Sequence, residues 1–224
     1  MREVTGPVVH ADIYWARVTT DAVQAFTASL SVAERDRMAR FHFERDRAAY
    51  AVAHGLLRRV LGRDLAGSYS GDFVLGPHGK PALAGTAGPH FNLSHAHGMV
   101  AVAICPAAPV GVDVEDLSRP LDGRALAASV LSRREMAALD RSGWQSGDFL
   151  ARWVTKEALA KAAGYGLHAD FREICLAGDP LAIVALPADF TACGPWSVSQ
   201  TVVGGHIIAA AVNGADASWT YHEC

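Results

Sequence analysis

The order of helical and strand-like segments is the feature that most constrains the fold of this chain. A segment from Ser31 to Gly62 carries apolar positions among many arginines, which predicts a helical region that ends at the glycine. Short apolar runs follow it, and the same order returns after a second helical region over 132–139 and 148–163. Helices and then strands, twice over, indicate an α+β protein of two similar halves, with expected bounds 1–108 and 109–224.

Composition argues against several classes of function. The 224 residues carry 20 Lys and Arg against 23 Asp and Glu, so no global field would recruit nucleic acid or an anionic membrane. The four cysteines lie far apart without a CxxC pair, which argues against a zinc knuckle, a redox motif or a disulfide framework. Because there is no signal-peptide core and no apolar run of about 18–20 residues, we expect a cytoplasmic protein without a membrane span. We also expect it to act as a monomer.

The middle of the chain predicts closely spaced strands. Glycine and proline recur over 67–89 and indicate short strands and turns. Met99 to Cys105 is an unbroken apolar run, and Val110 to Glu115 alternates between apolar and other residues. Because only 106–109 connect these two runs, we expect them to form an antiparallel hairpin.

The alternating run places two carboxylates on one face of its strand. The side chains of Asp113 and Glu115 point to one face of the strand, and those of Val112 and Val114 point to the other. The Cα atoms of Asp113 and Glu115 are roughly 6–7 Å apart, so both carboxylates can reach one cation. Small hard cations such as Mg²⁺ are held by one or two carboxylates together with phosphate oxygens. Taken alone, however, an Asp-x-Glu pattern more often marks the solvated acidic face of an edge strand.

A later helix adds a third carboxylate and a lysine. At about 100° per residue, Glu157 and Lys161 fall on the same broad face as the aromatic residues of the helix. A charge among aromatic residues is costly unless it is paired or binds a metal, which favours a site for an anionic phosphoryl group. The alternative is an ordinary i,i+4 pair on a solvated face, but we expect that face elsewhere, near Arg152 and Thr155.

Two further basic residues fall near this chemistry. In the expected hairpin register Val100 lies opposite Glu115, which puts His95 just beyond the acidic end. His95 could then donate a hydrogen bond to a phosphate oxygen, with Ser94 and the N–H groups of the turn as further donors. Lys80, in a glycine-rich turn, could also bind phosphate. The plainer interpretation of both is a solvated residue in a surface turn.

Four motifs between Gly79 and Leu167 occur in a recognisable order and spacing. They are Gly79-Lys80-Pro81, Phe91-Asn92-Leu93-Ser94-His95, Val110 to Glu115, and Trp153 with Lys156-Glu157-Ala158, Lys161, Gly164 and Gly166-Leu167. Together they closely resemble the 4′-phosphopantetheinyl transferases of the surfactin-synthetase-activating type. A looser similarity runs upstream through Glu34 to Arg37, Arg40-Phe41 and Leu57-Arg58.

The resemblance implies a reaction and a fold. Family members transfer the 4′-phosphopantetheine arm of coenzyme A to a serine of an apo acyl or peptidyl carrier protein, with Mg²⁺, and release adenosine 3′,5′-bisphosphate. Their products serve polyketide or nonribosomal peptide biosynthesis. Their fold is two α+β halves related by a pseudo-twofold axis, with the coenzyme in the cleft between them. We therefore expect coenzyme A and an apo carrier protein as the partners of this chain.

The resemblance also assigns roles to residues. Asp113, Glu115 and Glu157 would hold Mg²⁺ on the pyrophosphate, and Glu157 would take the serine proton directly or through a water. Lys161 and His95 would contact phosphate groups and complete the catalytic set. Lys80 and its neighbours would lie by the adenine. The other residues expected to bind the coenzyme are Arg37, Arg40, Gly79, Pro81, Asn92, Ser94 and Lys156.

One departure and two other functions stay open. Glu34 stands where some family members have a basic residue, so the grip on the 3′-phosphate would rest on Arg37 or Arg40. A metal-dependent hydrolase that cleaves a nucleotide pyrophosphate would keep the same site but need no carrier protein. A non-catalytic coenzyme-binding or scaffold protein would be favoured if the carboxylates lay too far apart to share a metal.

Overall fold

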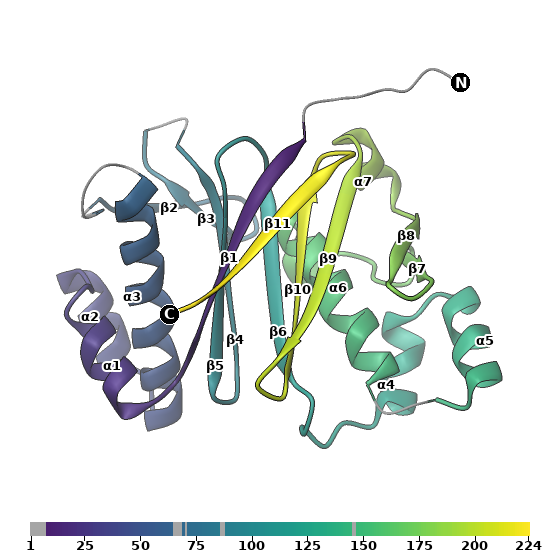
Figure 1. The fold of residues 1–224 in the computed structure, drawn as a ribbon, viewed down its shortest axis with the longest axis horizontal. Coiled ribbons are helices and arrows are strands. Elements are labelled where there is room, and N and C mark those ends of the chain that lie inside the picture. The colour runs from purple at the N-terminus through teal and green to yellow at the C-terminus, as the bar shows by residue number, and fades with distance from the viewer. Residues whose placement is uncertain (1–7, 65–68, 70, 86–87, 145–146) are drawn as a thin grey trace.

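Two β-sheets form the centre of the protein, and helices cover their outer sides (Figure 1). The computed structural model describes residues 8–64, 69, 71–85, 88–144 and 147–224. The first sheet has the strand order β11-β1-β5-β4, and the second has the order β6-β10-β9. The strands are β1 (Val9–Arg17), β4 (His90–Ala96), β5 (Met99–Cys105), β6 (Val110–Asp116), β9 (Trp196–Val203), β10 (His206–Asn213) and β11 (Ala217–Glu223).

The helices form two groups, one beside each sheet (Figure 1). The group beside the first sheet is α1 (Thr20–Thr27), α2 (Val32–Ala39) and α3 (Glu44–Asp64). The group beside the second sheet is α4 (Gly123–Val130), α5 (Arg133–Ser142), α6 (Asp148–Ala163), the 3₁₀ turn η1 (Gly166–His168) and α7 (Ala188–Ala192). Two short ribbons pair β2 (Phe73–Leu75) with β3 (Pro81–Leu83), and β7 (Cys175–Ala177) with β8 (Ala182–Ala185).

Local sequence signals set several helix ends. Ser31 and Ser132 each begin a helix through a capping box with the glutamate three residues later. The helical region predicted over 31–62 is divided into α2 and α3, because the chain turns between them and Arg47 donates a hydrogen bond to the Phe41 carbonyl in that turn. The prediction that Gly62 ends this region is wrong, since α3 continues through it to Asp64.

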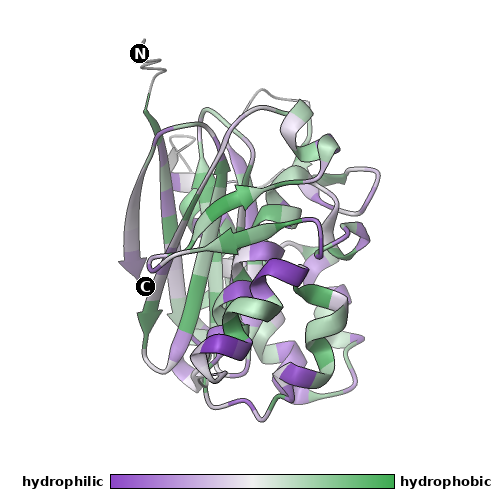
Figure 2. Ribbon diagram, turned by 90° about the vertical axis from the view of Figure 1, so that its right-hand side faces the viewer, coloured by the Kyte–Doolittle hydropathy of each residue, from purple (hydrophilic) through white to green (hydrophobic). Residues whose placement is uncertain are grey.

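The unbroken apolar run of β5 follows from burial on both of its faces. Val100 and Val102 pack with Leu56 of α3 on one side. Ala101 lies in the cluster that contains Val112 of β6, between the two sheets. The layers are therefore α3, first sheet, second sheet and α6, and Figure 2 shows the hydrophobic residues gathered along the strands.

The hairpin predicted between 99–105 and 110–115 is wrong. Both edges of β5 are already paired, with β1 on one side and β4 on the other, so no edge is left for β6. β6 instead pairs antiparallel with β10 in the second sheet, and 106–109 carry the chain from one sheet to the other. The hairpin that does form is β4–β5, with His95 opposite Val100.

The prediction of an α+β fold is confirmed. The last strand, β11, pairs parallel with β1, so the end of the chain lies in the first sheet. None of the helices in the described part of the chain combines the length and the apolar character that a membrane crossing needs.

Candidate active site

Strands β4 and β6 meet where the two sheets adjoin, and we call this junction the seam. They belong to different sheets, and side chains satisfy several backbone groups of β6 here. The Val112 N–H donates to Asn92 Oδ1 at 3.0 Å, and Lys161 Nζ donates to the Val112 carbonyl at 3.3 Å. Lys80 Nζ donates to the Val110 carbonyl at 2.9 Å. The seam is therefore bonded through side chains from both halves of the chain.

Helix α6 approaches β6 closely because residue 111 is glycine. A Cβ atom at Gly111 would lie 2.1 Å from the Ala158 carbonyl oxygen and 2.4 Å from the Ala162 nitrogen. Both atoms belong to the helix backbone, which cannot give way as a flexible side chain could. Gly111 thus sets the height of α6 above the strand, and this close contact brings Lys161 within reach of Asp113.

Asp113 is the most deeply enclosed acid of the seam, with 4% of the residue exposed. Its Oδ1 atom accepts hydrogen bonds from Ser94 Oγ and from Lys161 Nζ, each at 2.7 Å. Lys161 Nζ also donates to Ser94 Oγ at 3.0 Å and lies 3.8 Å from Glu157 Oε2. Three elements, β4, β6 and α6, therefore converge on one charged cluster.

The two remaining carboxylates of the cluster are Glu157 and Glu115. Burial, followed by repulsion from Asp113, raises the pKa of Glu157 to about 7, although Lys161 lowers it and Glu115 adds to the repulsion. Glu115 itself accepts a hydrogen bond from Arg119 Nη1 at 2.8 Å. Three carboxylates thus face two cationic side chains, and a further positive charge would relieve the repulsion.

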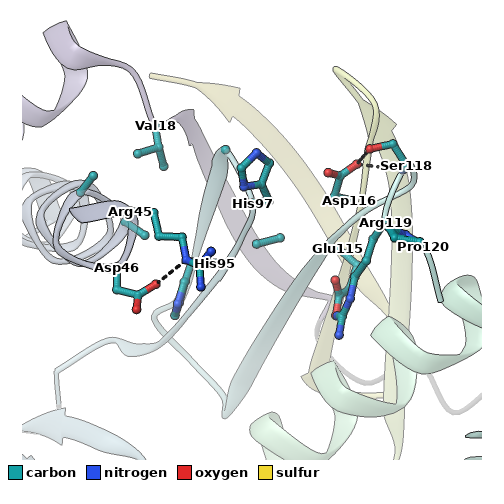
Figure 3. Close-up of a pocket in the computed structure, with 14 residues that line it drawn as sticks. Val18, Arg45, Asp46, His95, His97, Glu115, Asp116, Ser118, Arg119 and Pro120 are labelled. Atoms are coloured by element: carbon teal, nitrogen blue, oxygen red, sulfur yellow. Dashed lines mark hydrogen bonds and ion pairs between the residues drawn. The ribbon is translucent and has the colours of Figure 1, made fainter. Parts of the chain in front are cut away.

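A cleft of about 750 Å³ opens beside this cluster (Figure 3). It lies between the start of α3, the β4–β5 turn and the segment that follows β6. Its polar and charged lining residues are Arg45, Asp46, His95, His97, Glu115, Asp116, Ser118 and Arg119. Desolvation, and then the Lys161 ammonium, lower the pKa of His95, while Asp46 and Asp113 oppose this effect. A neutral imidazole and two arginines therefore line the same cavity as Glu115.

The structure brings most of the predicted catalytic residues together. Asp113, Glu157 and Lys161 form the cluster, and Glu115 and His95 line the adjacent cleft. Their carboxylates do not converge on a single point, because Lys161 lies against two of them and Arg119 holds the third. Within the ranges that the structure describes, no group of three His, Cys, Asp or Glu side chains is arranged to hold a metal ion.

Lys156, which we expected to bind the coenzyme, does not line the cleft. Its side chain is fully buried on the opposite side of α6, where its Nζ donates to Glu135 Oε2 at 2.7 Å and to the carbonyls of Val130 and Phe171. Thr155 is also buried rather than solvated, and its hydroxyl accepts a hydrogen bond from Gln200. Strand β9 covers the face of α6 that we expected to meet water.

The residues predicted at the adenine end lie apart from the cleft. Lys80 and Pro81 line a second hollow of about 670 Å³, together with Ala162 at the end of α6. Lys80 Nζ donates to the Ala162 carbonyl at 3.0 Å, and desolvation lowers the pKa of this lysine to about 8. Gly79 occupies the adjoining turn with a φ of 80°. Asn92 is buried in the seam between the two hollows.

Arg37 and Arg40, which we expected to bind the 3′-phosphate, are exposed and do not line the cleft. The Arg37 guanidinium lies 5.9 Å from the ring centre of Tyr50, and Arg40 Nε donates to the Asp36 carbonyl. Glu34 is buried and accepts hydrogen bonds from Arg58 and from the Ser31 N–H, and it also pairs with His54. Its role is therefore to join α2 to α3.

Sequence analysis missed several residues that line the cleft, namely Arg45, Asp46, His97, Ser118 and Arg119. The only available signal was the spacing of Arg119, four residues after Glu115. That signal is weak, because a strand end and a loop do not follow helical spacing.

The chain is similar to several known proteins. Residues 109–211 match the model of the 4′-phosphopantetheinyl transferase superfamily. The 4′-phosphopantetheinyl transferase HetI of Nostoc sp. is 31% identical over 196 residues, which cover 84% of this chain and 80% of HetI. The transferase Sfp of Bacillus subtilis is 26% identical over 176 residues, covering 76% of this chain and 77% of Sfp. The holo-[acyl-carrier-protein] synthase structure from Neisseria meningitidis is 24% identical, with a TM-score of 0.41, and covers 46% of this chain and 95% of that one.

A lysine at the side of a cleft can stabilise the charge on a transferring phosphoryl group, and carboxylates beside it can hold a cation that does the same. The identity to HetI, over most of both sequences, identifies the class more closely. This chain belongs to the 4′-phosphopantetheinyl transferase family and, as the match to Sfp indicates, to its surfactin-synthetase-activating type.

Proposed function

We propose that this enzyme transfers the 4′-phosphopantetheine arm of coenzyme A to a serine of an apo acyl or peptidyl carrier protein, with Mg²⁺, and releases adenosine 3′,5′-bisphosphate. The observation that carries the proposal is the cluster of Asp113, Glu157 and Lys161 beside a 750 Å³ cleft. Membership of the family supplies the reaction, and the cluster supplies groups suited to it. We propose polyketide or nonribosomal peptide carriers as the acceptors.

The oxygen donors of the cluster suit a hard divalent cation in their chemistry, although the described side chains are not arranged around a single point. Asp113, Glu115 and Glu157 offer only oxygen atoms, which Mg²⁺ prefers. The pKa of Glu157 is raised first by burial and then by repulsion from Asp113 and Glu115, and a cation beside these carboxylates would relieve that repulsion. These three carboxylates would hold the ion, and when bound it would supply positive charge for the pyrophosphate of the coenzyme.

The residues of the chain have separate tasks in the transfer. The serine oxygen forms a bond to the β-phosphorus, and the bond from that phosphorus to the bridging oxygen of the leaving bisphosphate breaks. The Lys161 ammonium and the His95 ring would donate hydrogen bonds to phosphate oxygens and stabilise their charge. Glu157 would accept the serine proton at a carboxylate oxygen, directly or through a water.

We also propose that the halves 1–108 and 109–224 are related by a pseudo-twofold axis. Support comes from the similar positions of α3 against β5 and α6 against β10, each covering the outer face of its own sheet. Strand β11 crosses this division by pairing with β1. Because both sides of the cleft come from one chain, we propose that the monomer is active.

A pyrophosphate hydrolase is the alternative that shares this site, and a coenzyme A consumption assay separates the two. Coenzyme A and Mg²⁺ are incubated with the enzyme alone, with an apo carrier protein, and with a carrier whose acceptor serine is replaced by alanine. We expect release of adenosine 3′,5′-bisphosphate only with the intact apo carrier. Equal release in all three mixtures would establish hydrolysis and contradict the proposal.

A further inference from the structure

Arg119 forms an ion pair with Glu115, the one carboxylate of the cluster that does not pair with Lys161. Its Nη1 atom donates to Glu115 Oε1 at 2.8 Å, while only 14% of the Glu115 side chain is exposed. The turn between them is fixed by its own hydrogen bonds, since Ser118 donates from both N–H and Oγ to Asp116 Oδ1. The Leu117 N–H also donates to the Gly205 carbonyl. The turn therefore directs Arg119 back toward Glu115.

Arg119 is much more loosely held than Lys161. Among the residues that the structure describes, the ion-pair partner of Arg119 is Glu115 alone, and 52% of the arginine side chain is exposed. Lys161 is 24% exposed and has Asp113, Ser94 and the Val112 carbonyl as acceptors. An exposed ion pair contributes little free energy and is easily exchanged, whereas an enclosed one is not. Of the two cations at the cluster, Arg119 is the one that can leave.

There is room for such a movement. Arg119 lines the cleft on one side and, on the other, a groove of about 240 Å³ that also contains Leu117, Arg124 and Trp144. Figure 3 shows its side chain directed along the cleft toward Glu115. A guanidinium that leaves Glu115 therefore remains between the cleft and this groove and is not forced into the core.

We infer that Arg119 is a displaceable counter-ion of Glu115, which competes with the divalent cation for this carboxylate and so sets the cation affinity of the enzyme. The inference rests on the proposed function, because it assumes that Glu115 serves a cation. The physical reason is that Oε1 of Glu115 is already bonded to one positive group, and a guanidinium and a divalent cation repel each other at the same carboxylate. We therefore expect cation binding to weaken the Arg119–Glu115 pair, and removal of Arg119 to favour cation binding.

Direct binding of Mn²⁺ tests this inference without measuring activity. The free ion is titrated by electron paramagnetic resonance against the wild-type enzyme, Arg119→Gln, Arg119→Lys and Arg45→Gln, each with and without coenzyme A. We expect Arg119→Gln to bind Mn²⁺ about two- to fivefold more tightly, the factor that an exposed ion pair corresponds to. Arg119→Lys should fall between it and the wild type. Added salt should shrink the difference, because it screens the pair.

Arg45→Gln is the matched control for the electrostatic effect of removing any one positive charge from the cleft. Arg45 also lines the cleft, but it pairs with Asp46 rather than with a carboxylate of the cluster. We expect its removal to change the Mn²⁺ affinity much less than the removal of Arg119. Thermal unfolding, monitored by circular dichroism, checks that all variants are folded before their Mn²⁺ affinities are compared.

The possible failures separate the two proposals. Equal affinity of wild type and Arg119→Gln, or an equal gain in Arg45→Gln, overturns the role of Arg119 while leaving the cation site intact. Absence of Mn²⁺ binding in every variant, with and without coenzyme A, overturns the cation site of the proposed function and this inference with it. Binding that appears only in Arg119→Gln supports both.

Discussion

Helix α6 carries two lysines five residues apart, and they illustrate two kinds of ion cluster. Lys156 is fully buried, and its three N–H groups have three acceptors, one of them Glu135. Glu135 is in turn saturated by Ser132 and by the Leu176 N–H, so this cluster is closed. Lys161 instead faces acids that outnumber the cations, beside a cleft. A closed cluster joins elements of the fold, whereas an open one has charge left to bind a ligand.

The largest expected effect is the loss of stability when the closed cluster is broken. Lys156→Met would leave Glu135 buried without its cation, which costs about 3–5 kcal/mol in the free energy of unfolding. Urea unfolding measures this loss, and Lys161→Met on the same helix is the control, with a smaller expected loss. Equal losses in the two variants would remove the distinction between the clusters.

Asp113→Ala should break the open cluster and abolish activity rather than folding. Without this carboxylate, Lys161 loses its closest anionic partner and the proposed cation site loses one of three ligands. We expect Mg²⁺-dependent transfer to fall by about a hundredfold or more. Circular dichroism should show a folded protein. Full activity in this variant would contradict the role of the cluster.

Glu34 forms a second closed cluster with Arg58 and His54. This cluster should make the stability of the protein sensitive to acid. Burial alone would raise the pKa of Glu34. Hydrogen bonds from His54, Arg58 and the Ser31 N–H outweigh burial and lower this pKa from 4.5 to about 2. The carboxylate therefore stabilises the protein above about pH 4.5, and this contribution, about 3 kcal/mol, is lost as the pH falls toward 2.

Urea unfolding at pH 6 and pH 3 tests the role of Glu34. Wild type should lose more stability between the two pH values than Glu34→Gln, which has no carboxylate to protonate. The same pH dependence in both proteins would show that Glu34 does not contribute in this way.

Lys161→Ala should have the smallest of these effects, a change in kinetics. Its ammonium would no longer contact phosphate oxygens, and we expect kcat/KM to fall at least tenfold, which corresponds to about 1.4 kcal/mol. Steady-state kinetics with an apo carrier measure this change, and Lys161→Arg, which keeps the charge, should recover part of it. An unchanged kcat/KM would remove Lys161 from the site.

The parts of the site that depend on local geometry could be predicted from the sequence. Alternation along one strand correctly placed Val112 and Asp113 on opposite faces, and helical spacing correctly grouped Glu157 with Lys161. Both rules need only the nearest few residues. The α+β class followed from the same local patterns.

The parts that depend on long-range pairing could not be predicted in this way. The β5–β6 hairpin failed because β1 takes the edge of β5, and β1 lies about 90 residues earlier in the chain. Lys156 was misplaced because nothing in its neighbourhood reveals Glu135, 21 residues away, as a buried partner. Arg119 was missed because a loop, not a regular element, returns it to Glu115.

Intact-mass spectrometry of an apo carrier protein, incubated with coenzyme A and Mg²⁺, tests the central claim most directly. With the wild-type enzyme the carrier should gain the mass of one 4′-phosphopantetheine group, and with Asp113→Ala it should stay unmodified. Carriers of both the acyl and the peptidyl kind that stay unmodified with folded wild-type enzyme would contradict the claim that this site catalyses the transfer.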